Sequence, residues 1–460
     1  MTSSNIAVAA SGWLARWRPV LPLFGAEAIA WTGFGALFPV LPLFYTQQGV
    51  DLATLGLVVA AWPAARLVGE PVFGWLADRV PRVPLMVAGL GLTAAFVALP
   101  LVVHGAAAFV ALRALAGLST SIYDPAARGL LMDATPADRQ GEAFGLWGAM
   151  QMAGLLLGPA IGGIGAAVFG SVAFVFIFGG ISAVLAALAV SAGVRDVPRR
   201  EVGPGSQVGR GLPAAGLADF QRDFARDLPR LDLTEPRPVA GVGPAVAGDA
   251  VSPAVPDRLA NRLLLAAVVA NVGAYFGAGT YEVIWSLFLA SMGAGVGFIG
   301  LTFMMFSLPV LLLGTWAGRL VDRRGSLLFI TGGSCAIGIC AVSYPLIPDP
   351  LWSLPILVVE GVAFAFLVPA LYAVVSRGAP PGRSSTAQGL FGAAGTLGFV
   401  VASLITGVLA EVDLRYPFYL FGSVILATLV LALAIGRRDI LAVEPRRAVG
   451  AIARGPASSL

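Results

Sequence analysis

The chain contains a long internal repeat, and this repeat limits the folds that it can adopt. Gly33 recurs as Gly277 and Gly117 recurs as Gly361, so both pairs are separated by 244 residues (277 minus 33, 361 minus 117). Each copy is a long apolar unit that cannot enclose a path alone, and such repeats are typical of pseudo-symmetric transporters with a substrate site between the halves. Further pairs at the same offset are Gly35 and Gly279, Gly74 and Gly318, Asp78 and Asp322, Arg79 and Arg323, Pro125 and Pro369, Gly145 and Gly389, and Gly148 and Gly392.

The composition is that of a membrane protein. Hydrophobic residues make up 58% of the chain and charged residues only 12%, whereas soluble domains carry roughly 25% charge. Continuous apolar runs, each able to cross about 30 Å of hydrocarbon, favour helices over a β-barrel. We therefore predict an all-α polytopic membrane protein with two six-helix bundles. Its twelve runs are 19–46, 52–78, 83–103, 106–133, 140–168, 171–194, 260–290, 297–321, 326–346, 352–376, 383–410 and 415–436.

A segment without membrane-length runs divides the two halves. It is rich in Pro, Gly, Arg and Asp, and residues 217–228 have either the pattern of an amphipathic surface helix or that of a partly ordered linker. The predicted domains are an N-terminal bundle (1–194), a cytoplasmic linker (195–258), a C-terminal bundle (259–438) and a cytoplasmic tail (439–460).

The arginines predict the orientation in the membrane. They are concentrated in alternate loops, whereas the opposite loops carry Arg415 beside acids such as Asp51 and Asp349. Because positively charged loops stay in the cytoplasm, both termini are expected there, in a multi-pass protein of the cell membrane. The net charge of +4 therefore reflects topology and gives no reason to expect a nucleic-acid partner.

Enzymatic chemistry finds little support in the sequence. His104 is the only histidine, so histidine metal clusters are excluded. Cys335 and Cys340 lie in one apolar run and are expected to be packing residues. No phosphate-binding loop is present. We predict no catalytic residues, no metal and no cofactor, and a monomer that binds a small molecule, protons and the lipid bilayer.

The loop after the second run carries a recognisable motif. It contains Gly74, Asp78, Arg79 and Arg82, and it resembles the signature of the major facilitator superfamily, although Pro81 stands where that family usually has glycine. The resemblance implies a latch on the outward-facing state formed by this motif, with Asp133 as partner; the second copy supplies Asp322 and Arg323. Alternatively, these arginines serve topology alone.

The fifth run carries a second motif. Gly154, Gly158, Pro159, Gly162 and Gly163 match the antiporter motif of the drug/proton exporters in the same superfamily, whereas the second half lacks it. The glycines permit tight packing and the proline bends the helix. Generic packing of small residues is the alternative interpretation. The resemblance covers all twelve runs but not the linker or the tail.

Charges inside the runs are costly and usually functional. Glu27 and Arg113 both fall near the middle of the bilayer, and Arg113 heads a segment similar to the superfamily motif that is associated with proton coupling. We predict that they form a proton-coupling site; a static ion pair between them is the alternative. Arg66 with Glu70 and Asp124 with Arg128 have the spacing of helical pairs. Candidates for the cavity lining are Trp31, Phe34, Phe38, Tyr123, Tyr275, Tyr281, Glu282 and Glu360, of which the two acids are either a second cation site or vestibule residues.

Together these features predict a proton-coupled secondary transporter that exports small lipophilic, often cationic, compounds by alternating access. A transporter of a specific metabolite, such as a sugar or a siderophore, is the first alternative. A sensor that uses the same fold without transport is the second.

Overall fold

The structure is a computed structural model that describes residues 17–136, 139–196, 259–380 and 383–443. Over these residues it is helical and contains no strand. Eleven of its helices are long and apolar enough to cross a membrane, and one bent pair raises the number to as many as twelve, in agreement with the twelve runs. The long helices are α4 (Leu52–Ala77), α5 (Arg82–Ala98), α6 (Ala106–Ala134), α7 (Gln140–Phe169), α8 (Ala173–Gly193), α10 (Arg262–Ser291), α11 (Val296–Arg324), α12 (Ser326–Ser343), α13 (Ser353–Gly378), α14 (Ser384–Ala410) and α15 (Tyr416–Val443).

The first predicted run is broken in the structure. It forms α2 (Leu21–Leu37) and α3 (Leu41–Gln47), which meet at an angle of 44°. Pro39 lies within this break and Pro42 lies in the first turn of α3, and a proline ring lacks the N–H that would continue a helix. The prolines therefore bend the span between its two helices.

The last helix is longer than predicted. α15 continues to Val443, beyond the predicted end of the bundle at residue 438. Arg437 and Arg438 lie exposed on this helix, where long basic side chains extend toward water from an apolar stem. The predicted helix at 217–228 and the rest of the tail lie outside the described residues.

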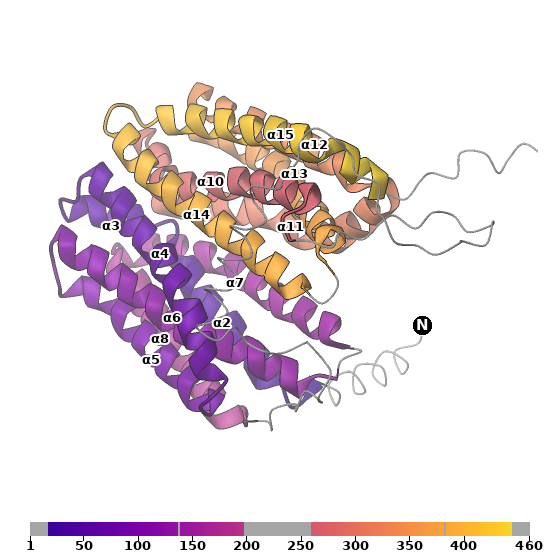
Figure 1. The fold of residues 1–460 in the computed structure, drawn as a ribbon. Helices are drawn as coiled ribbons and strands as arrows, with labels where there is room; N and C mark the ends of the chain where they lie inside the picture. The colour runs from indigo at the N-terminus through magenta and orange to yellow at the C-terminus, as the bar shows by residue number, and fades with distance from the viewer. Residues whose placement is uncertain (1–16, 137–138, 197–258, 381–382, 444–460) are drawn as a thin grey trace, which may run out of the picture.

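The helices form two bundles with the same internal arrangement. α2 packs on α7 and α8 in the first bundle, as α10 packs on α14 and α15 in the second. α6 packs on α4 and α5, as α13 packs on α11 and α12. Figure 1 shows the first bundle in indigo to magenta below the second in orange and yellow. The sequence repeat is therefore a structural repeat.

The bundles meet through α4 with α14 and through α7 with α11, two pairs that the repeat relates to one another. We call the end of the molecule that holds Trp17 and the loop 78–81 the terminal end, and the end that holds the loops 48–51 and 411–415 the distal end. Figure 1 shows the terminal end on the right, near the N-terminal label.

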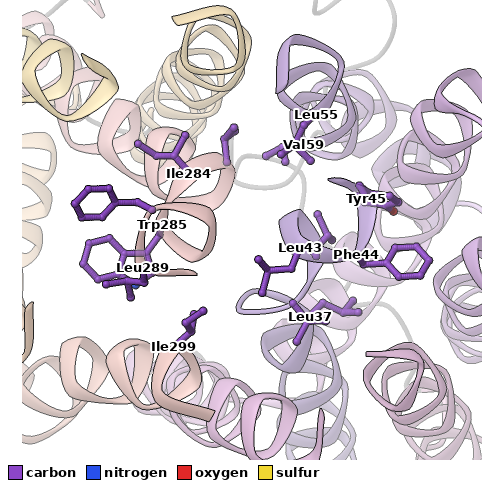
Figure 2. Packing of buried hydrophobic residues seen from close by; sticks show 14 of the residues in the cluster. Leu37, Leu43, Phe44, Tyr45, Leu55, Val59, Ile284, Trp285, Leu289 and Ile299 are labelled. Carbon is purple, nitrogen blue, oxygen red and sulfur yellow. The ribbon is translucent and has the colours of Figure 1, made fainter. Parts of the chain in front are cut away.

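The buried side chains show that the bundles are joined at the distal end. One core cluster there combines residues of both bundles, and Figure 2 shows side chains of α2, α3 and α4 facing those of α10 and α11. Toward the terminal end each bundle has a core of its own, one within residues 17–194 and the other within 259–440. The bundles are therefore packed together at the distal end, and the space between them is closed there.

Candidate functional site

Glycines bring the bundles into backbone contact at the distal end. A Cβ atom on Gly56 of α4 would lie 2.4 Å from the carbonyl oxygen of Ser403 on α14. On the other side of the interface, a Cβ atom on Gly300 of α11 would lie 2.4 Å from the carbonyl oxygen of Pro159 on α7. Real Cβ atoms do not approach this closely, so any larger residue at these positions would separate the helices.

A buried ion pair also links the bundles. Arg113 of α6 donates from Nη2 to Oε1 of Glu282 on α10 over 2.9 Å, and each side chain is 8% exposed. Both residues lie about two turns from the distal ends of their helices. Separating the bundles at this end therefore requires Arg113 and Glu282 to part.

Glu27 is fully buried within the first bundle, where three side chains donate hydrogen bonds to it. Trp31 Nε1 and Gln151 Nε2 donate to Oε1 over 2.8 and 2.7 Å, and the Tyr123 hydroxyl donates to Oε2 over 2.7 Å. All three donors are neutral side chains. Gln151 was not among the predicted residues, although it is a polar residue within the apolar middle of α7.

The predicted pairing of Glu27 with Arg113 is not found. Glu27 is bonded inside the first bundle, whereas Arg113 pairs with Glu282 of the second. A static bridge between Glu27 and Arg113 is therefore excluded in this conformation. The sequence placed both residues at a similar depth but could not show which way each side chain points.

A pocket lies beside Glu27 in the first bundle. Trp31, Phe34 and Tyr123 line it, as predicted for the cavity, and so do Trp62 and Arg66, which the prediction of the cavity lining omitted. Trp62 stacks on Phe34 with ring centroids 4.9 Å apart. Trp31 and Tyr123 both line the pocket and donate to Glu27, so they connect the pocket to the acid directly.

Four charges form one cluster at the edge of this pocket. Arg66 bonds Glu70 over 2.5 Å and also pairs with Asp124, which lines the pocket. Arg128 lies 3.6 Å from both Glu70 and Asp124. The two helical pairs expected from the sequence are thus present and are joined by Arg66 into a network of balanced charge.

The other cavity candidates lie elsewhere. Glu360 is 1% exposed and accepts hydrogen bonds from the hydroxyls of Tyr281 (2.8 Å) and Tyr344 (2.7 Å), so it lies inside the second bundle and not in an open vestibule. Phe38 stacks on Phe303 across the interface between the bundles, with ring centroids 6.1 Å apart. Tyr275, on α10, is 38% exposed.

The loop motif after α4 makes the expected contacts. Arg82 lies 2.5 Å from Asp133 at the end of α6 and 3.7 Å from Asp78, and the Arg79 guanidinium lies over the ring of Trp75. In addition, Asp196 accepts hydrogen bonds from the backbone N–H groups at the start of α5, a contact that was not predicted.

Two parts of this motif make few close contacts in this conformation. A Cβ atom on Gly74 would meet only Pro125, at an ordinary 3.7 Å, so Gly74 does not bring two helices into backbone contact here. The second copy differs as well: Asp322 and Arg323 are exposed on the last turn of α11, and among the described residues no ion pair is found for Asp322.

The glycines of α7 pack tightly against two other helices, as both the antiporter motif and generic packing of small residues predict. Cβ atoms on Gly154, Gly158 and Gly162 would lie 2.6, 2.6 and 2.2 Å from atoms of α2, and one on Gly163 would lie 2.7 Å from the backbone of α11. Pro159 lies within the helix between these contacts. One stripe therefore packs α7 against its own bundle and against the other.

Comparison with known proteins agrees with this architecture. The sequence profile described as "Major Facilitator Superfamily" matches residues 23–392 and 267–456. The chain belongs to this superfamily. It is 23% identical to the quinolone resistance protein NorA of Staphylococcus aureus (strain COL), over 90% of this chain and 96% of that protein. Over a shorter region, 29% of this chain and 34% of the relative, it is 28% identical to multidrug resistance protein 2 of Bacillus subtilis (strain 168).

Solved structures show the same fold. A bacterial homologue of the human lysosomal transporter Spinster, in an inward-facing and unoccupied conformation, superimposes with a TM-score of 0.68 at 14% identity and covers 93% of this chain and 97% of its own. A mutant of the peptide transporter POT gives a TM-score of 0.67 at 16% identity, over 92% of this chain and 95% of its own. The chain is a transporter of this superfamily, with eleven or twelve membrane-length helices among its described residues, and it is similar to two drug-resistance proteins.

Proposed function

We propose that this chain is a proton-coupled exporter of small lipophilic, often cationic, compounds, of the multidrug-efflux type. The observation that carries this function is Glu27, an acid fully buried in a membrane helix and bonded by three neutral donors beside an aromatic pocket. Buried acids of this kind in a membrane helix usually mark a path for protons or cations. The names of the two resistance proteins that the chain resembles support the same class of cargo.

Glu27 is suited to exchange a proton for cargo. Since its donors are neutral, taking up a proton breaks no ion pair and leaves no stranded positive charge. Trp31 and Tyr123 hold the carboxylate and also line the pocket. A cargo that displaces either ring therefore changes the hydrogen bonds of Glu27, and a proton on Glu27 changes the orientation of the rings.

The conformation is one that an exporter must adopt to take up its cargo. If the arginine-rich loops are cytoplasmic, the terminal end faces the cytoplasm and the distal closure makes the structure inward-facing. Cargo then enters from the cytoplasm, and the proton reaches Glu27 from outside after the distal end has opened. Each chain contains both bundles, so a monomer is sufficient for this cycle in the cell membrane.

Arg113 has a coupling role through the interface between the bundles. Its pair with Glu282 is buried and must break when the distal end opens, and parting the two charges is costly unless each of them reaches water. A proton on Glu282 removes the attraction between the two groups, and opening of the distal end then lets water reach the remaining charge of Arg113. Proton entry from the distal side and opening of the distal end are then one event.

The deciding experiment measures pH-gradient-driven uptake of a fluorescent lipophilic cation into inverted vesicles. Glu27→Gln keeps the size and the hydrogen-bonding capacity but cannot release a proton, so uptake should fall to the level seen with an uncoupler. Glu360→Gln is the matched control, because Glu360 is equally buried but lies outside the pocket. It should keep gradient-driven uptake. Normal uptake by Glu27→Gln, or equal losses in both variants, would contradict the role of Glu27.

A double variant tests Arg113. Arg113→Gln alone strands the buried Glu282, whereas Arg113→Gln combined with Glu282→Gln leaves no stranded charge. The double variant should recover stability but should transport cargo without requiring the gradient. Full recovery of gradient-dependent transport would show that the pair is structural.

A further inference from the structure

Arg66 lies between an aromatic ring and a carboxylate, a position that would suit a cationic cargo. Its Cζ lies 4.7 Å from the centroid of the Trp62 ring, and its guanidinium pairs with Asp124. Arg66, Trp62 and Asp124 all line the pocket, which is otherwise mostly apolar and aromatic. An aromatic face opposite a carboxylate is the arrangement that binds organic cations. In this structure the cation between them belongs to the protein itself.

The charges around Arg66 allow it to leave this place. Glu70 lies one turn further along α4 and bonds the same guanidinium at 2.5 Å from Nη2 and 3.0 Å from Nε. Glu70 is 35% exposed, whereas Asp124 is 10% exposed. Arg66 can therefore keep an ionic partner near water while it gives up its bond to Asp124. The carboxylate that faces the pocket would then be available to another cation.

The balance of the cluster makes this an exchange. Arg66 and Arg128 neutralise Glu70 and Asp124, so a cargo cation added beside them brings an uncompensated charge into a pocket of low dielectric constant. A cation that replaces Arg66 at Asp124 brings none. A cation must therefore bind at Asp124 more tightly than Arg66 does in order to replace it.

We infer that Asp124 and Trp62 form a binding site for monovalent lipophilic cations, and that Arg66 is a tethered competitor which selects among them. This inference rests on the proposed function for the class of cargo. Cations with a broad aromatic surface and dispersed charge displace Arg66, because they also contact the rings of Trp31, Phe34 and Trp62. Small, strongly hydrated cations do not.

Equilibrium binding of tetraphenylphosphonium to the purified protein, with no pH gradient, tests the inference. Arg66→Gln removes the competitor, and the affinity should rise by about tenfold, the effect of one charge-assisted contact. Asp124→Asn should lower the affinity by a similar factor, and the double variant should resemble Asp124→Asn. Arg66→Lys keeps a tethered cation and should stay within about threefold of the parent protein.

Two controls isolate the competition. Arg128→Gln removes a positive charge of the same cluster that is 43% exposed and 3.6 Å from Asp124, so its effect should be much smaller than that of Arg66→Gln. Triphenylphosphine oxide, a neutral relative of the probe, should bind equally to the parent protein and to Arg66→Gln.

Tetraphenylphosphonium affinity that is unchanged or reduced in Arg66→Gln would overturn the competitor role. If that variant does not fold, Asp124→Asn decides: unchanged affinity there overturns the site. The measurement does not depend on the proton gradient. Tighter binding by Arg66→Gln together with an inactive transport assay would therefore support the site and refute the proposed export.

Discussion

Replacement of Gly162 by alanine should weaken the packing of α7 on α2. A Cβ atom at this position would lie 2.2 Å from the carbonyl oxygen of Ala36 and 2.9 Å from its Cα, and both are backbone atoms that cannot rotate away. Overpacking of this kind costs about 1–3 kcal/mol, and the helix must shift to relieve it. The same substitution also stabilises a helix by about 1 kcal/mol, because alanine loses less backbone entropy than glycine.

Gly148→Ala on the same helix separates these two effects. No atom lies within 4 Å of a Cβ atom placed on Gly148, so this variant gains the helix stabilisation without the clash. The free energy of unfolding, measured by titration with a denaturing detergent, should therefore be lower in Gly162→Ala than in Gly148→Ala by about 1–3 kcal/mol. Transport by Gly162→Ala should fall as well. Equal stability of the two variants would refute the close approach of α7 to α2.

Three further outcomes are expected. Asp196→Ala should lower the free energy of unfolding by about 1 kcal/mol, because it removes the cap of α5, and Asp196→Asn should restore the stability. Asp51→Ala removes a comparable cap at the distal end and is the control for an effect on gating. Asp78→Asn should leave the stability within about 0.5 kcal/mol, because Asp78 is 53% exposed, but should reduce transport; normal transport would assign the motif to topology alone. Hydrogen bonds from Thr54 lower the pKa of Asp51. The cap of α4 should therefore be intact at pH values above the ordinary pKa of aspartate and be lost as the pH falls through the lowered pKa. Hydrogen exchange of the Thr54 amide can follow this loss.

The sequence predicted the fold because its signals are local or strictly repeated. Apolar runs gave the helices, and the offset between the repeats gave the relation between the bundles. The run 19–46 was predicted without a break, although Pro39 within it is a local signal for a bend. The extension of α15 to Val443 had none, because Arg437 and Arg438 fit equally well in a loop or on the exposed turn of a helix.

The candidate site was predicted only in part, because the partner of a charge depends on tertiary structure. Burial of Glu27 follows from its position in an apolar run, but its donor Gln151 lies on another helix. Arg113 and Glu282 belong to different bundles, and their contact also depends on which end of the molecule is closed. A sequence encodes the alternating states together, whereas the structure shows one of them.

The repeat is symmetric in its helices and asymmetric in its chemistry, and this difference is consistent with one half carrying the exchange. The first bundle holds Glu27 with its neutral donors, the pocket and the paired Arg82, whereas the second encloses Glu360 with two tyrosine hydroxyls. In the part of the chain that the structure describes, the distal cluster joins the bundles through glycine contacts, the pair of Arg113 with Glu282, and a hydrogen bond from the Ala53 N–H to Glu411. Each bundle also has a core of its own toward the terminal end, so separation at the distal end would leave these two cores intact. Arg113 and Glu282 form the ion pair in this cluster, so the proposed control of opening rests on whether a proton on Glu282 weakens their contact.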